Sequence, residues 1–119
     1  MPILEVEVVT GQGESLQPEL AQRLADEAGD VLGAPPGRTW CRLRALPSAQ
    51  YAENRADVSK DLPVFVTVLK ARAGNPVELK DELAKLCTAL AHACGRPRES
   101  VHILYLPEAE GRMSFGGEL

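Results

Sequence analysis

The residue with the clearest potential for chemistry is Pro2, which directly follows the initiator methionine. Initiator methionine is commonly removed when a small residue comes next, and its removal here leaves a proline whose nitrogen is a secondary amine. The ring fixes the direction of that amine. An apolar pocket with cations nearby favours the neutral form of the amine, which can act as a general base. The alternative is that Pro2 only begins a strand, so the residue alone indicates proton transfer without establishing it.

Other familiar catalytic patterns do not occur in the sequence. It contains no Ser/His/Asp set, no glycine-rich phosphate loop and no pair of histidines at metal-binding spacing. The three cysteines, Cys41, Cys87 and Cys94, lack zinc-binding spacing and are predicted to pack as small apolar residues. We therefore expect neither a metal ion nor a cofactor.

The elements that must position Pro2 form two copies of one unit. Residues 2–9 are echoed by residues 63–69, and residues 33–36 are echoed by residues 95–98. Each copy has the order strand, helix, strand, because apolar residues alternate at its start and recur at helical spacing in its middle. A duplicated strand-helix-strand unit predicts the order of strands and helices along the whole chain.

The second helix has the better-defined ends. Asn75 can cap it, Pro76 suits its first position, and Glu78 completes a capping-box spacing. Gly33 and Gly95 are the predicted stop signals of the two helices. The apolar stripes consist of Leu20, Leu24, Ala28, Val31 and Leu32 in the first helix and of Leu79, Leu83, Leu86, Leu90 and Cys94 in the second.

The strands of the two copies, residues 2–9, 39–46, 63–69 and 101–106, are predicted to form one sheet. Right-handed crossovers place both helices on the same face of that sheet, so we expect an α+β fold built from two β-α-β repeats. The other face is left uncovered, and there Glu5 and Glu7 can meet Arg42 and Arg44. A mixed surface of this kind is typical of a protein that associates with copies of itself.

Chain length and charge set further limits. A chain of 119 residues suits one domain, with repeat one at residues 2–46, a linker at residues 47–62 and repeat two at residues 63–119. The linker is long enough to be functional, although a solvated connection explains it equally well. The net charge of −4 and the absence of a large basic cluster argue against a nucleic-acid partner, while a small anionic substrate stays possible. No apolar run reaches the ~20 residues of a membrane span and no signal peptide is evident, so we expect a cytoplasmic protein without a membrane partner.

Taken together, several features resemble the tautomerase superfamily along essentially the whole chain. They are Met1 and Pro2 before an alternating strand, the duplicated unit, and the Ser-Phe-Gly-Gly ending at residues 114–117. Residues 64–74 and the pair Arg42 and Arg44 look most like 5-carboxymethyl-2-hydroxymuconate isomerases. The fused relatives of 4-oxalocrotonate tautomerase are also similar, and macrophage migration inhibitory factors are similar at a greater distance.

This resemblance implies a homotrimer with one active site per subunit and Pro2 at the base of each site. The proline of such proteins moves a proton between carbon and oxygen positions, so the expected activity is that of a tautomerase or isomerase acting on a small 2-hydroxy-dienoate or keto acid. By position, Arg42, Lys70, Arg72 and His102 are the predicted substrate-binding residues, joined by Phe115. Each has a simpler alternative: an ion pair with Glu5 or Glu7 for Arg42, solvation for Lys70 and Arg72, and an interface position for His102.

The sequence departs from its relatives at three positions that affect the substrate. Asn75 stands where the isomerases have an arginine, the turn at residues 11–14 lacks an arginine, and Ala34 replaces a lysine of the inhibitory factors. The tail at residues 111–117 has no apolar face on its own chain, so Phe115 is expected to anchor it to a neighbour, near the neighbour's Pro2.

Two other functions remain open at this point. A protonated proline would act as an acid in a hydratase, dehalogenase or decarboxylase, with water activated by Glu53, Glu108 or Glu110. A chain that keeps Met1 would have an amide nitrogen at Pro2 and would be a non-catalytic trimeric relative.

Overall fold

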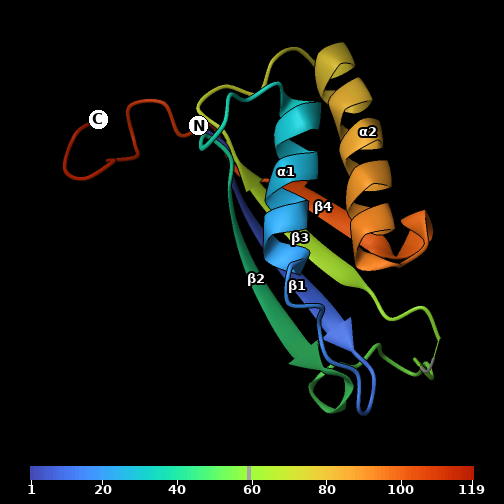
Figure 1. Cartoon of the computed structure of the whole chain (residues 1–119). Helices are drawn as coiled ribbons and strands as arrows, with labels where there is room; N and C mark the ends of the chain where they lie inside the picture. The colour runs from blue at the N-terminus through green and yellow to red at the C-terminus, as the bar shows by residue number, and fades with distance from the viewer. Residues whose placement is uncertain (59) are drawn as a thin grey trace.

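The computed structural model describes residues 1–58 and 60–119 (Figure 1). Its main elements are β1 (Ile3–Thr10), α1 (Leu20–Leu32), β2 (Trp40–Pro47), β3 (Val64–Leu69), α2 (Pro76–Cys94) and β4 (Val101–Tyr105). Two single-turn 3-10 helices, η1 (Ser48–Gln50) and η2 (Arg98–Ser100), follow β2 and precede β4. The predicted strands and helices are confirmed, with boundaries that differ by one or two residues. The predicted linker at residues 47–62 includes Ser59, which lies outside the described residues, so the division of the chain stays a prediction.

The four strands form one sheet in the order β2-β1-β3-β4. β1 is parallel to β2, β3 is parallel to β4, and the two central strands are antiparallel. Each parallel pair belongs to one repeat and is joined by that repeat's helix, so both helices lie on the same face, in front of the sheet in Figure 1. This arrangement confirms the predicted α+β class with two β-α-β repeats.

The core lies between the sheet and the two helices, and strand alternation determines which residues enter it. The apolar residues at every second position of β1 and β3, such as Val6 and Val66, are at most 1% exposed, whereas their neighbours point to the other face. Leu24 of α1 and Leu90 of α2 are fully buried against this surface. Burying one such leucine contributes about 1.5–3 kcal/mol, so these layers supply most of the stabilisation.

The ends of α2 show why the helix begins and stops where predicted. The Asn75 side chain accepts a hydrogen bond from the Glu78 N–H at 2.8 Å, and the Glu78 side chain accepts one from the Asn75 N–H, which completes a capping box. Gly95 ends the helix at φ 65°, a left-handed conformation that glycine adopts at little cost.

The predicted packing role of the cysteines agrees with the structure. All three thiols are free and half-buried, and their side chains pack against the core. Burial raises the pKa of Cys41 and of Cys94 to about 11, so both thiols stay protonated and unreactive near neutral pH. Within residues 1–58 and 60–119, no three His, Cys, Asp or Glu side chains are grouped as a metal site would require. Across the same residues, no helix is long and apolar enough to span a membrane.

The face away from the helices is open in the single chain, as predicted. Register places Glu5 beside Arg42 and Glu7 beside Arg44, and Arg42 forms an ion pair with Glu5. Apolar side chains flank this charged centre, and the exposed ones are Trp40, Phe65, Leu104 and Leu106.

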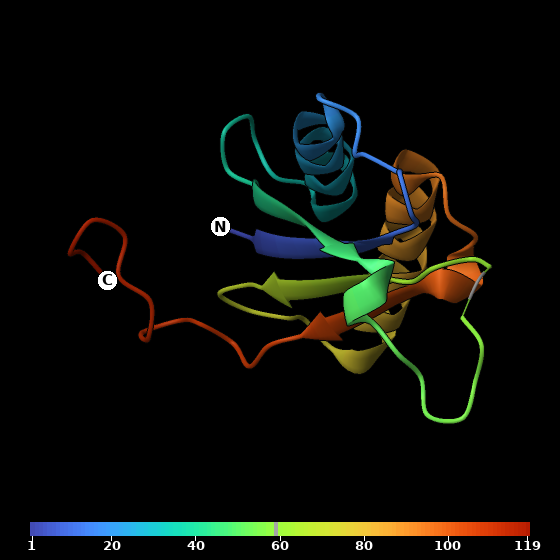
Figure 2. The ribbon, with the colours of Figure 1, turned by 90° about the horizontal axis from the view of Figure 1, so that it is seen from below.

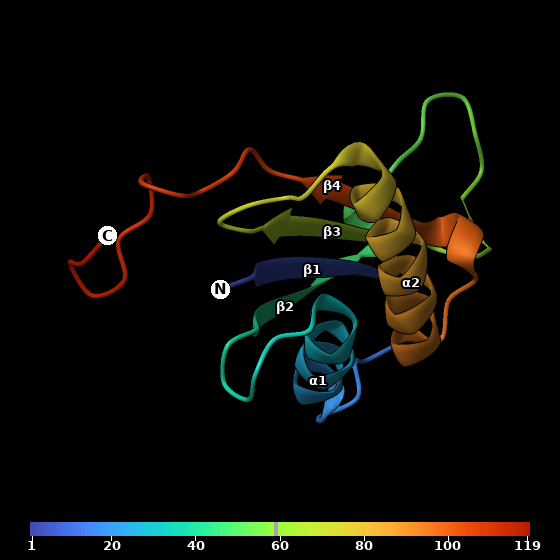
Figure 3. The same ribbon diagram turned by 90° about the horizontal axis from the view of Figure 1, so that it is seen from above.

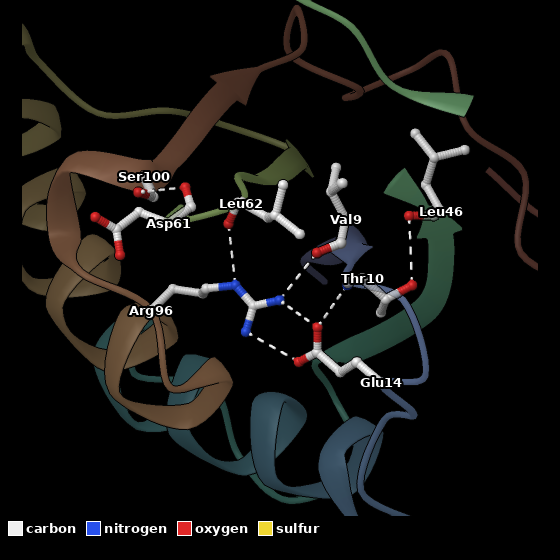
Figure 4. Close-up of polar contacts among 9 residues, drawn as sticks. Val9, Thr10, Glu14, Leu46, Asp61, Leu62, Arg96 and Ser100 are labelled. Carbon is white, nitrogen blue, oxygen red and sulfur yellow. Dashed lines mark hydrogen bonds and ion pairs between the residues drawn. The ribbon is translucent and has the colours of Figure 1, made fainter. Parts of the chain in front are cut away.

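At the edge where β1 ends, the Arg96 guanidinium joins three segments (Figure 4). It donates to the carbonyls of Leu62 and Val9 at 3.0 and 2.9 Å and forms an ion pair with Glu14 at 3.1 Å. Ser100 donates to the Asp61 carbonyl at 3.0 Å nearby. These bonds tie the loop before β3 to the end of β1, which makes this edge structural.

Candidate active site

Three strands bring their ends together around Pro2. The parallel strands β1 and β2 begin at one edge of the sheet, and the antiparallel β3 ends there, as Figure 2 shows. Ile3 lies opposite Trp40 on one side and Leu69 on the other. Continued by one residue, this register places Pro2 beside Lys70, and the Pro2 carbonyl accepts a hydrogen bond from the Trp40 N–H at 3.0 Å.

A cavity of about 380 Å³ opens at this edge and includes buried Pro2 in its wall. Five of its seven lining residues are apolar and two are cations, and the set consists of Met1, Pro2, Leu32, Ala34, Pro35, Arg38 and Lys70. Burial beside positive charges favours the neutral form of an amine, and the positive charges attract a carboxylate. The predicted Pro2 and Lys70 therefore meet at one site, which we call the proline cavity.

Lys70 is held in place by the second repeat. Its ammonium lies 2.9 Å from a carboxylate oxygen of Glu82 on α2, and both side chains are about four-fifths buried, at 21% and 19% exposed. The other Glu82 oxygen accepts a hydrogen bond from the Tyr105 hydroxyl of β4. Burial and this bond raise the pKa of Tyr105 above its usual range, so the hydroxyl stays a donor. Lys70 is therefore not simply solvated: it lines the cavity and is held by an ion pair with Glu82.

Arg38 is the cavity residue that the sequence reasoning missed. It is exposed at the end of the turn after α1, and its N–H donates to the Pro35 carbonyl at 3.1 Å. The signal that could have identified it is strand register, because parallel strands begin at the same edge and Arg38 comes two residues before β2. When the parallel register of β1 and β2 is continued by two residues, Arg38 lies opposite Met1.

The structure does not bring Arg72 and Arg42 to the proline cavity. The Arg72 guanidinium makes two parallel bonds, of 2.8 and 2.6 Å, to the carboxylate of Glu110. This partner raises the pKa of Arg72 and lowers that of Glu110, so both stay charged near neutral pH. Arg42 forms an ion pair with Glu5 on the open face, which is the structural alternative considered from the sequence.

His102 lies toward the other end of the sheet from Pro2. Its ring lies 5.6 Å from the ring of Phe65, which is opposite Glu7 in the sheet register. At ~3.3 Å per residue, that position is about 17 Å along β1 from Pro2. Within one chain, His102 therefore belongs to the open face and not to the proline cavity.

Sequence comparison finds no matching family model and no matching curated protein. Comparison with solved structures finds several proteins of the same architecture. A fused 4-OT that forms an asymmetric trimer is 20% identical, with a TM-score of 0.76 over 98% of this chain and 94% of that chain. Macrophage migration inhibitory factor from Trichinella spiralis is 15% identical, with a TM-score of 0.72 over 98% and 97% of the two chains. Malonate semialdehyde decarboxylase is 17% identical, with a TM-score of 0.69 over 96% and 90%.

The chain has the tautomerase fold. The resemblance predicted from the sequence is thereby confirmed at the level of architecture. At sequence identities of 15–20%, this likeness describes the fold alone.

A second hollow, of about 180 Å³, is also lined by Met1, and we call it the tail hollow. Its lining consists of Met1, Leu69, Ala71, Ala109, Glu110, Gly111, Met113, Phe115 and Leu119. Phe115 meets Trp40 of its own chain edge to face, with ring centroids 5.7 Å apart. The tail thus finds a partner within the chain, and its predicted contact with a neighbour stays a prediction.

The carboxylates considered for water activation already have partners within the tautomerase fold. Glu53 accepts a hydrogen bond from the Tyr51 hydroxyl at 2.7 Å, and Glu108 accepts one from the Ala73 N–H at 2.7 Å. Glu110, the third, lines the tail hollow and is bound by Arg72. A carboxylate in such contacts is poorly placed to serve as a base toward water.

Proposed function

We propose that this chain is a cofactor-independent tautomerase or isomerase in which the amine of Pro2, freed by removal of Met1, is the general base. The substrate is a small 2-hydroxy-dienoate or keto acid. The observation that carries the proposal is buried Pro2 in the wall of a cavity that also holds Arg38 and Lys70.

The chemistry requires a neutral amine and a positive charge where negative charge develops. In the proline cavity, burial and two neighbouring cations favour the neutral amine. The amine takes a proton from the substrate and returns it at another atom of the conjugated system, so no proton is lost or gained overall. Arg38 and Lys70 bind the substrate carboxylate and stabilise the enolate oxygen between the two transfers.

Two of the predicted site residues that lie away from the proline cavity, Arg42 and His102, enter this proposal through self-association of the chain. The structural neighbours include fused 4-OT proteins described as trimers, and the open sheet face offers a surface for self-association. We propose a cytoplasmic homotrimer that uses this face. Arg42 and His102 then lie at or near a subunit boundary, where they can reach the substrate of an adjacent subunit.

The proposed function is tested by intact mass and by the Pro2→Ala variant. We expect the native mass to lack Met1, and we expect the processed protein to convert the enol form of 2-hydroxymuconate or phenylenolpyruvate, followed by ultraviolet absorbance. Pro2→Ala should lower kcat/KM by about 10²-fold or more, since a positioned base contributes about 10²–10⁴-fold. The assembly should be unchanged, because the variant replaces one small apolar side chain by another.

Val77→Ala is the matched control, because Val77 is an apolar side chain 79% exposed on α2. It should retain the wild-type kcat/KM. Full activity in Pro2→Ala, or turnover by a protein that keeps Met1, would show that proline is not the base.

A further inference from the structure

Three side chains of the second repeat meet beside the proline cavity, and we call Lys70, Glu82 and Tyr105 the Lys70 cluster. Lys70, which follows β3, lines the cavity, and its ammonium lies 2.9 Å from one carboxylate oxygen of Glu82 on α2. The other Glu82 oxygen accepts a hydrogen bond from the Tyr105 hydroxyl of β4. Both oxygens of the Glu82 carboxylate are therefore engaged.

The ion pair between Lys70 and Glu82 is unusually buried for this chain. Its side chains are 21% and 19% exposed, whereas every other ion pair within residues 1–58 and 60–119 has at least one side chain that is 38% exposed or more. Moving two charges out of water costs free energy that their attraction often only offsets, so a buried pair is a poor stabiliser. Stability alone does not explain these charges.

The first repeat shows that apolar side chains can fill the same positions. When the glycines that end the two helices, Gly33 and Gly95, are matched, Leu24 corresponds to Leu86, and both leucines are fully buried. The fold therefore packs without charges at the counterparts of the Lys70 cluster, and the charged set lies at the edge that holds Pro2. Those counterparts are buried or pack against the core, and they are Val8 for Lys70, Leu20 for Glu82 and Leu43 for Tyr105.

A lysine that is held in place binds an anion better than a free one. Its flexible four-carbon stem loses rotamer entropy when the ammonium is fixed, and Glu82 imposes that loss before the substrate arrives. The bond from Tyr105 orients the carboxylate in turn. An ammonium has three N–H donors and Glu82 accepts one, so two are left for a carboxylate in the cavity.

We infer that Glu82 and Tyr105 are positioning residues for substrate binding, which hold the Lys70 ammonium at the wall of the proline cavity with its remaining N–H donors available to the substrate carboxylate. This inference rests on the proposed function for the chemistry at Pro2. Neither Glu82 nor Tyr105 is among the described residues that line the cavity, so each acts through Lys70.

The test is a double-mutant cycle between Glu82 and Lys70 on the processed protein, with the enol forms of 2-hydroxymuconate and phenylenolpyruvate as substrates. We expect Glu82→Leu, which introduces the residue type of repeat one, to lower kcat/KM about tenfold, as for loss of a charge-assisted hydrogen bond. Lys70→Met should lower kcat/KM at least as much. In the Lys70→Met background, Glu82→Leu should have no further effect, because the ammonium through which Glu82 acts is absent.

Graded variants distinguish positioning from folding. Glu82→Gln keeps an oxygen for Lys70, and Tyr105→Phe keeps the carboxylate, so each should lose less activity than Glu82→Leu. Asp81→Asn is the matched control and should retain the wild-type kcat/KM, since Asp81 precedes Glu82 on α2 and its ion pair with Lys85 is exposed. Melting temperatures show that each variant is folded, and if Glu82→Leu does not fold, Glu82→Gln takes its place in the cycle.

Binding separates this inference from the proposed function. Adipate is a dicarboxylate that cannot tautomerise, and its Kd from calorimetry should rise about tenfold in Glu82→Leu and in Lys70→Met, with no further rise in the double variant. That pattern without turnover of either enol acid supports the positioning role and refutes the proposed activity. Unchanged adipate binding and kcat/KM in Glu82→Leu, or an equal loss from Glu82→Leu with and without Lys70, would overturn the positioning role, whereas loss of turnover in Pro2→Ala would still support the proposed function.

Discussion

At the scale of single residues, cationic side chains have different surroundings at the two edges of the sheet. Arg38 and Lys70 line the proline cavity, whereas Arg96 is 13% exposed and bonded to two carbonyls and to Glu14. A guanidinium engaged in this way is not available to a substrate, and its removal leaves two carbonyls without their donor. The surroundings of an arginine therefore decide its role.

Glu14 makes the stability of the protein depend on pH at this edge of the sheet. The hydrogen bond from the Gly11 N–H, followed by the contact with Arg96, lowers the pKa of Glu14 from its usual value of 4.5. A carboxyl whose folded-state pKa is lowered stabilises the protein above its unfolded pKa, and that contribution is lost as pH falls through the folded pKa.

We expect Glu14→Gln to lower the free energy of unfolding at pH 7 by less than about 1 kcal/mol, because the pair is partly exposed. The difference from wild type should shrink as pH falls below about 4.5, and urea unfolding at several pH values measures it. Glu118→Gln, in the exposed tail, should show no such trend. A difference that grows toward acid pH would mean that the Glu14 carboxylate destabilises the fold.

At the scale of elements, the start of α2 shows the role of Asn75 in this chain. Its side chain caps the helix by accepting a hydrogen bond from the Glu78 N–H. The cap also orients the loop that leaves β3 after Lys70. The position therefore has a structural task in this chain.

Replacing the cap should cost stability without altering chemistry. We expect Asn75→Ala to lower the free energy of unfolding by about 1 kcal/mol, because an N–H of the first helical turn loses its acceptor. Chemical denaturation measures the change. Asn75→Ser keeps an acceptor and should retain most of the stability, and an equal loss in both variants would assign another role to the amide.

At the scale of the whole molecule, the C-terminal tail joins two features of the fold. It runs past the edge where β1 begins, as Figure 3 shows, and Phe115 contacts Trp40 at the rim of the open face. Phe115 also lines the tail hollow, together with Met1. Assembly through the open face and access to Pro2 are therefore expected to depend on one segment.

We predict that truncation after Glu110 weakens the proposed trimer and lowers the proposed turnover together. The deletion uncovers Trp40 and removes Met113 and Phe115, which line the tail hollow. Sedimentation equilibrium and steady-state kinetics on the truncated chain measure the two effects. An assembly of unchanged affinity with unchanged kcat/KM would show that the tail is dispensable.

The sequence by itself determined the layers, the helix ends and the position of Pro2 at the head of β1. These features follow from local patterns: alternation buries Val6 and Val66, and Asn75 and Gly95 bound α2. Each pattern lies within one element or between neighbours, so the burial of apolar groups and the bonding of helix ends specify it without knowledge of distant residues.

Only the tertiary structure decided which cation meets Pro2. Arg72 lies two residues after Lys70, yet a carboxylate far along the chain, Glu110, binds Arg72, while Glu82 holds Lys70 at the cavity. Arg38 joins the site through the register of two strands that begin at the same edge. Ion pairing depends on the few ångströms between side chains from distant segments, and no periodicity in the sequence encodes that distance.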